Sequence, residues 1–125
     1  MKSTPMIIRA EKLSKTYKKG GTAVKAINLQ VRKGEIFGLV GPDGAGKTTT
    51  IQMLCSILEP TSGRAEIAGL DIREEAETIK EKIAYMSQDF SLYGNLTVEQ
   101  NIEFFADLHQ IPAGLRVERK KEFLA

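Results

Sequence analysis

Residues 41–48 read Gly41-Pro42-Asp43-Gly44-Ala45-Gly46-Lys47-Thr48, which matches the pattern G-x-x-x-x-G-K-[ST] at every required position. The three glycines let the backbone curl tightly, so that successive N–H groups face a single anion. A helix that begins at Lys47 adds its free N–H groups and the positive end of its dipole. The sequence therefore predicts a phosphate-binding loop, with an accidental glycine-rich turn as the alternative.

The side chains at the end of this loop predict a magnesium-bound nucleoside triphosphate. Lys47 supplies a positive charge to the β- and γ-phosphates, the Thr48 hydroxyl is a suitable Mg²⁺ ligand, and Thr49 can reach the α-phosphate. A carboxylate at Asp43 is unfavourable near a triphosphate unless it points away or is paired. Asp43 therefore affects how tightly the loop would bind a triphosphate, and it does not affect the match to the motif.

The segments on either side of the loop have the patterns that such a loop requires. Residues 35–40 form a nearly continuous apolar run, which predicts a strand covered on both faces. Residues 47–58 predict a helix, which residues 60–63 (Pro-Thr-Ser-Gly) end. Cys55 is then a small core residue rather than a reactive thiol. Four residues fall on one face of this helix: Ile51, Leu54, Cys55 and Leu58.

The remaining patterns indicate alternating short strands and helices. Period-2 or apolar runs predict strands at residues 7–13, 27–31, 65–67 and 83–86. Helices are expected at residues 73–82, 97–111 and 113–125. Thr97 and Gln100 have the spacing of a capping box, which marks where the second of these helices begins.

Composition places the chain among ordinary globular proteins. It has 125 residues, 42% hydrophobic and 27% charged, which excludes collagen, disordered tails and disulfide-rich miniproteins. No apolar run approaches the roughly 20 residues of a membrane helix, and the N-terminus lacks the apolar stretch of a signal peptide. We therefore expect a cytoplasmic protein.

Residues 1–33 hold nine basic residues and one acid. We interpret this segment as solvated strands and loops near a nucleotide site, with attraction of phosphate polymers as the alternative.

With these motifs in place, the chain resembles the ATP-binding-cassette family, the nucleotide-binding subunits of ABC transporters. The resemblance covers roughly residues 7–105. It rests on collinear stretches: Leu13-Ser14-Lys15-Thr16-Tyr17, residues 34–50, Glu59-Pro60-Thr61-Ser62-Gly63, residues 83–88 and residues 96–101. It implies an α/β fold, a P-loop NTPase with an ABC-type ATPase core and an antiparallel β subdomain. Residues 1–125 are then the N-terminal part of one ATP-binding domain, which ends inside a helical subdomain that starts near residue 96.

The resemblance also assigns residues and partners. Tyr17 matches the aromatic residue that stacks on adenine, and Gln88 matches the glutamine that senses Mg²⁺ and the attacking water. Lys47 and Gln88 are then the catalytic residues, with ATP and Mg²⁺ as cofactors. The implied partners are a second ATP-binding domain packed head to tail and a membrane-spanning permease subunit at the inner face of the membrane, and no nucleic acid is expected.

Two other polar features have plainer interpretations. His109, the only histidine, lies on a predicted helix face before Pro112, far upstream of the family's switch histidine. We interpret it as a helix residue with ordinary contacts. The basic run at residues 116–121 is interpreted as a solvated helix face.

Several family motifs are absent from residues 1–125. There is no signature of the Leu-Ser-Gly-Gly-Gln type, no apolar run followed by Asp-Glu, and no switch histidine. Phosphoryl transfer needs clamped phosphates, a held metal and a positioned water, so hydrolysis by these residues alone is not expected. The apolar run at residues 35–40 would also lack a neighbouring strand, which predicts marginal stability or dimerisation.

Three functions remain open at this point. The first is the ATPase domain of a membrane exporter. It is favoured by residues 91–93 (Ser-Leu-Tyr) before Leu96-Thr97-Val98, because this stretch resembles most the sequences of the drug and polysaccharide export branch. The second is a soluble ABC-type ATPase associated with ribosomes or DNA repair. The third is a nucleotide-binding module without catalysis.

Overall fold

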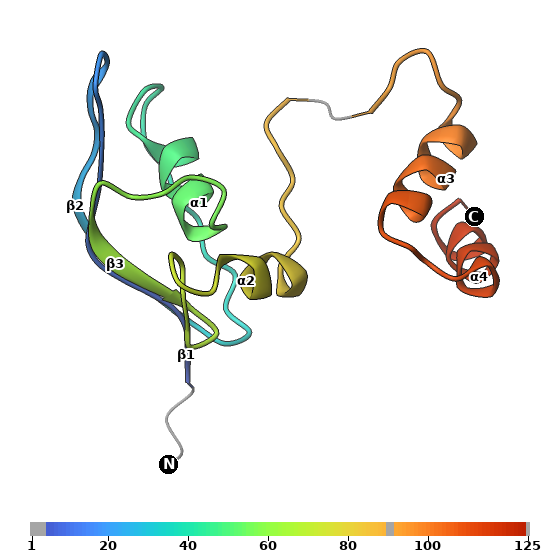
Figure 1. Cartoon of the computed structure of the whole chain (residues 1–125), viewed down its shortest axis with the longest axis horizontal. Coiled ribbons are helices and arrows are strands. Elements are labelled where there is room, and N and C mark those ends of the chain that lie inside the picture. Colours follow the sequence, from blue (N-terminus) through green and yellow to red (C-terminus); the bar gives the residue numbers. More distant parts are fainter. Residues whose placement is uncertain (1–4, 90–91, 125) are drawn as a thin grey trace. The chain divides into compact units, whose positions relative to one another are not determined.

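The computed structural model describes residues 5–89 and 92–124. Ser91, which belongs to the stretch that resembles the export branch, lies outside the described residues. The chain divides into two compact units, Met1–Tyr85 and Met86–Ala125. Figure 1 colours the first unit from blue to yellow and the second in orange and red.

The first unit is built on an antiparallel sheet with the strand order β2-β1-β3-β4 (Figure 1). Its strands are β1 (Met6–Tyr17), β2 (Gly21–Arg32), β3 (Ser62–Ile67) and β4 (Leu70–Asp71). The strands predicted at residues 7–13, 27–31 and 65–67 are therefore confirmed, and two of them are much longer than predicted. The two-residue strand β4 was not predicted.

Two helices complete the core of this unit. These are α1 (Lys47–Leu54) and α2 (Ala76–Lys82). The fully buried side chains of Leu13, Met53 and Ile79 join β1, α1 and α2 in a single hydrophobic cluster. Removal of this apolar surface from water is the main stabilising contribution to the unit.

Helix α1 departs from the predicted helix in length and in its buried face. It ends at Leu54, with Cys55 as its C-cap, four residues before the predicted end. Its buried residues are Thr50, Met53 and Leu54, whereas Ile51 is exposed. Of the predicted face, Leu54 is buried and Leu58 packs against the core, so Ile51 is the member that departs from it, because packing decides between neighbouring stripes of a helix with a 3.6-residue period. Cys55 is half-buried, as expected of a small core residue, and burial raises the pKa of its thiol.

The strands predicted at residues 35–40 and 83–86 are not formed. Ile36, Val40 and Met86 are almost fully exposed instead. A strand needs a hydrogen-bonded neighbour, and none of the described segments pairs with either run. The predicted marginal stability or dimerisation stays a prediction.

The second unit contains α3 (Val98–Leu108) and α4 (Ala113–Phe123). The predicted capping box is confirmed, since the Gln100 N–H donates to the Thr97 hydroxyl at 3.2 Å and the Thr97 N–H donates to the Gln100 side chain at 2.8 Å. Pro112 is the N-cap of α4. Within the described residues, none of the helices has the length and apolar character needed to cross a membrane.

The interpretation of residues 116–121 as a solvated face is wrong for two of its members. Arg116 pairs with Asp107 at 2.5 Å and with Glu103 at 3.2 Å, and Lys120 pairs with Glu103 and with Glu99. Hydrogen bonds from Lys120 and then from Arg116 lower the pKa of Glu103. These ion pairs connect α4 to α3, a contact between helices that a charge run by itself does not disclose.

Candidate phosphate-binding site

The phosphate loop enters α1 through a glycine that no other residue can replace without strain. Gly46 is the N-cap of α1 and has the left-handed backbone conformation, with φ 88° and ψ 11°. A Cβ at this position would lie 2.2 Å from the carbonyl oxygen of Ala23 and 3.0 Å from the Cγ2 atom of Val24. Real Cβ atoms do not approach a backbone oxygen so closely, so Gly46 lets the loop lie against the start of β2.

Lys47 folds back over its own loop. Its ammonium group donates to the carbonyl oxygen of Gly41 at 2.8 Å and to that of Pro42 at 2.7 Å. The Ala45 N–H also donates to the Pro42 carbonyl, at 3.2 Å. The loop is thus closed on itself with its one ammonium group held at its entrance by two neutral acceptors.

The three threonines that follow have different environments. The Thr50 side chain is buried, and its hydroxyl donates to the Gly46 carbonyl at 2.9 Å. Thr48 is exposed and Thr49 is half-buried. The first N–H groups of a helix have no carbonyl within the helix to bond, so those at the start of α1 are open to an anion. Thr48 is therefore free to act as a ligand, whereas Thr50, which the sequence analysis did not single out, fixes the helix start.

Asp43 lies at the exposed turn of the loop. It forms no ion pair with any residue in the described part of the chain. An exposed carboxylate is screened by water and salt, which reduces its repulsion of a bound triphosphate.

Tyr17 lies at the end of β1, opposite Gly21 in the β1–β2 ladder. Its ring is 41% exposed. Two residues beyond Gly21, the carbonyl of Ala23 contacts Gly46 of the phosphate loop. The same end of the β1–β2 hairpin therefore holds the predicted adenine platform and borders the predicted phosphate site.

Gln88 is exposed and belongs to the second unit. That Gln88 lies near Mg²⁺ and the attacking water stays a prediction. The loop at residues 93–97 is held by Asn101, which is 6% exposed. The Asn101 amide donates to the carbonyls of Tyr93 and Thr97 at 3.1 and 3.0 Å, and its oxygen accepts from the Tyr93 N–H at 2.9 Å.

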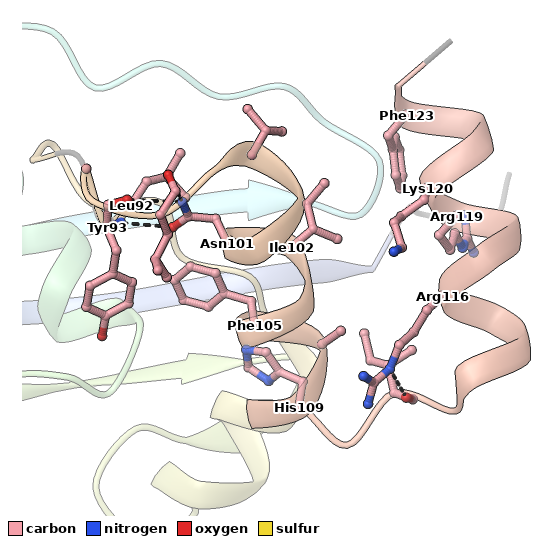
Figure 2. Close-up of a pocket in the computed structure, with 15 residues that line it drawn as sticks. Leu92, Tyr93, Asn101, Ile102, Phe105, His109, Arg116, Arg119, Lys120 and Phe123 are labelled. Carbon is pink, nitrogen blue, oxygen red and sulfur yellow. Dashed lines mark hydrogen bonds between the residues drawn. The ribbon is translucent and has the colours of Figure 1, made fainter.

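This loop and the two helices border a pocket in the second unit (Figure 2). The pocket has a volume of about 720 Å³ and an apolar wall that includes Tyr93, Ile102 and Phe105. His109 also lines it, at the C-cap of α3. The sequence spacing of Val98, Ile102, Phe105 and His109 places them on one face of a helix, and all four line this pocket.

Comparison with known proteins shows which family this sequence is similar to. A family model described as "ABC transporter" matches residues 24–124. The "Probable multidrug ABC transporter ATP-binding protein YbhF" of Escherichia coli (strain K12) is 46% identical over 116 residues, which are 93% of this chain and 19% of that protein. The "Glycine betaine/carnitine/choline transport ATP-binding protein OpuCA" of Bacillus subtilis (strain 168) is 40% identical over 119 residues, which are 94% of this chain and 31% of that protein.

Solved structures agree. The "Dimeric Structure of MJ0796, a Bacterial ABC Transporter Cassette" is similar with a TM-score of 0.77 and 28% identity, covering 92% of this chain and 54% of that one. For cbiO1 of Clostridium perfringens the TM-score is 0.72 at 29% identity, covering 94% of this chain and 48% of that one. The predicted fold class, a P-loop α/β core with an antiparallel β subdomain, is confirmed. The chain spans about half of these cassettes and less than a third of the two relatives.

Proposed function

The chain belongs to the ABC transporter family, and we propose that its residues 41–49 bind the triphosphate of ATP together with Mg²⁺. The observation that carries this proposal is the closed loop before α1, with Gly46 in the left-handed conformation and Lys47 folded over it. In a longer protein that supplies the groups missing from these residues, binding would lead to hydrolysis that powers transport.

Phosphate binding exchanges the partners of Lys47. The ammonium group leaves the neutral carbonyls of Gly41 and Pro42 and donates instead to charged phosphate oxygens. A charged phosphate oxygen adds Coulomb attraction to the hydrogen bond that a neutral carbonyl also provides, which favours the exchange. The N–H groups of Gly44 and Gly46 and those that begin α1 complete the cradle.

Thr48 is the residue that would hold Mg²⁺. Its exposed hydroxyl follows Lys47 at the start of α1, and a single hydroxyl leaves room for phosphate oxygens and water, which Mg²⁺ retains in most sites. The metal supplies charge stabilisation to the phosphates. Gln88 is proposed as a second polar group near the metal and the attacking water.

Tyr17 is proposed to stack on the adenine. Its half-exposed ring offers a flat apolar face, and it lies on the hairpin end that touches the phosphate loop. In this arrangement two residues contribute separately to ATP binding. Lys47 recognises the charge of the phosphates, and Tyr17 recognises the base.

We propose two protein partners. The first is a second cassette, packed head to tail so that each supplies its signature loop to the other's nucleotide, and the dimeric MJ0796 cassette supports an assembly of this kind. The second is a membrane-spanning permease at the cytoplasmic face, which the loop after Gln88 and the apolar pocket beside α3 would contact. The description of YbhF as a multidrug transporter protein supports a drug as the transported molecule.

The experiment that tests this function is calorimetric titration of the 125-residue chain with Mg-ATP and, separately, with inorganic tripolyphosphate. Binding of both, with ATP the tighter ligand, supports the proposal. Binding of neither overturns it.

A further inference from the structure

The turn that follows α1 is fastened to the end of β1 that bears Tyr17. The Thr61 N–H donates to the carbonyl of Ser14 at 2.9 Å, and the Thr16 N–H donates to the Thr61 hydroxyl at 3.0 Å. The same hydroxyl donates to the Thr16 carbonyl at 3.2 Å. The Lys15 ammonium donates to the carbonyl of Glu59 at 2.6 Å. Three successive β1 residues are thus bonded to one turn.

The turn itself is held firmly. Gly63 has a φ of +81°, and a Cβ there would lie 2.2 Å from the carbonyl oxygen of Lys12, so its backbone lies directly on β1. From the β4–α2 side, Arg73 donates to the carbonyls of Pro60 at 2.9 Å and Gly63 at 3.2 Å. The carbonyl that accepts from Lys15 therefore belongs to a turn fixed at both ends.

Lys15 makes a second contact, to the ring of Tyr17. Its ammonium nitrogen lies over the ring, 5.4 Å from the centroid. This is within the distance at which a cation is attracted by the face of an aromatic ring. The ammonium of Lys15 thus joins the fixed turn after α1 to one face of the ring, and Tyr17 remains 41% exposed.

We infer that Lys15 is a positioning residue for the nucleotide base: anchored by the Glu59 carbonyl, it holds the Tyr17 ring so that adenine stacks on the ring face away from the ammonium. This inference rests on the proposed function. A ring that is already oriented loses less freedom when the base binds, which increases affinity without a direct contact between Lys15 and the ligand. Since α1 carries the phosphate loop at its other end, the turn at residues 59–63 links the base and phosphate parts of the site.

The test is a double-mutant cycle between Lys15 and Tyr17, read by the dissociation constants of Mg-ATP and of inorganic tripolyphosphate. The variants are Lys15→Met, which keeps the apolar stem, Lys15→Arg, which keeps the charge, Tyr17→Ala, and the double variant. Lys18→Met removes a nearby exposed charge and serves as the control. Thr61→Val and Thr61→Ser test the turn, and circular dichroism checks that each variant is folded.

We expect Lys15→Met to weaken Mg-ATP binding by about two- to fivefold, the range of an exposed cation–π contact, and to leave tripolyphosphate binding unchanged. Lys15→Arg restores the affinity, and Lys15→Met has no further effect once Tyr17 is alanine. Thr61→Val weakens Mg-ATP binding in the same selective way, and Thr61→Ser does not.

Three results overturn the inference while the proposed function stands. The first is equal loss of ATP and tripolyphosphate binding in Lys15→Met, and the second is a loss that adds fully to that of Tyr17→Ala. A selective effect of Lys18→Met as large as that of Lys15→Met would also contradict it. If the unmodified chain binds neither ligand, the proposed function fails, and this inference fails with it.

Discussion

The carbonyl oxygen of Ala23 lies 2.2 Å from the point where a Cβ of Gly46 would be, so the phosphate loop and the β1–β2 hairpin meet without room for a side chain. This contact joins two parts of the molecule that are 23 residues apart in the sequence. It fixes the loop against the hairpin end that carries Tyr17, and the proposed nucleotide site depends on it.

Gly46→Ala should therefore disrupt the loop. The substitution forces a side chain into the left-handed region and against a backbone carbonyl, and backbone strain of this kind costs on the order of 1–3 kcal/mol. We expect the free energy of unfolding to fall by at least that amount, measured by urea denaturation, and Mg-ATP binding to be lost. Gly38→Ala is the control, because a Cβ there meets nothing within 4 Å and its φ is not positive. Equal stability and affinity of the two variants would contradict the contact.

Glu103 should make the pairing of α3 and α4 sensitive to acid. Hydrogen bonds from Lys120 and Arg116 lower the pKa of Glu103 in the folded chain. A carboxylate with a lowered pKa stabilises the fold above its unfolded pKa, and that contribution is lost as the pH falls through the lower folded value. Amide hydrogen exchange in α4 should therefore show protection that is constant above about pH 5 and falls as the pH drops below the ordinary Glu pKa of about 4.3, after correction for the intrinsic exchange rate.

Glu103→Gln should reduce this loss of protection, since glutamine does not titrate. Glu118, also on α4, forms no ion pair in the described part of the chain. Glu118→Gln should therefore show the same loss of protection at low pH as the unmodified chain. The same pH profile in the unmodified chain and in Glu103→Gln would be evidence against the ion pairs.

Asn101 should control the order of the loop at residues 93–97. Its buried amide bonds the backbone of Tyr93 and Thr97, and a buried backbone group left without a partner costs roughly 1–3 kcal/mol. Asn101→Leu should speed hydrogen exchange at the Tyr93 N–H, whereas Asn95→Ala, at an exposed position of the same loop, should not. Unchanged exchange at Tyr93 in Asn101→Leu would show that the loop is ordered by other contacts.

Steady ATP hydrolysis is not expected from the 125-residue chain. Its sequence contains no Leu-Ser-Gly-Gly-Gln signature and no Asp-Glu pair. Without these groups the phosphates are clamped but the water and metal are not fully positioned. A phosphate-release assay should give the background rate for the purified chain. Steady release that Lys47→Ala abolishes would refute this prediction.

The sequence predicted best those features that are set by neighbouring residues. The start of α1 at Lys47 and the Thr97–Gln100 capping box formed as predicted because each depends on backbone geometry within a few residues. Residues 35–40 failed as a strand because strand pairing depends on a distant segment. Their apolar run indicated burial but could not supply the hydrogen-bonded neighbour.

Contacts across long sequence separations could not be predicted. Lys15 and Glu59 are 44 residues apart, and neither residue type indicates that one bonds the backbone of the other. The same holds for Lys120 and Glu103, since a charged residue on a helix is usually solvated. Thr50 was missed because its residue type does not indicate that its side chain is buried and that its hydroxyl bonds the Gly46 carbonyl.

The central claim is that Lys47 and the loop at residues 41–48 bind the phosphates of Mg-ATP. The most direct measurement is the dissociation constant of Mg-ATP for the unmodified chain and for Lys47→Ala, by calorimetry at one fixed salt concentration. Loss of a charge-assisted hydrogen bond costs roughly 1.5–3 kcal/mol, so we predict that Lys47→Ala weakens binding by about 10- to 150-fold while the chain stays folded. Equal affinity of the two proteins would contradict the account.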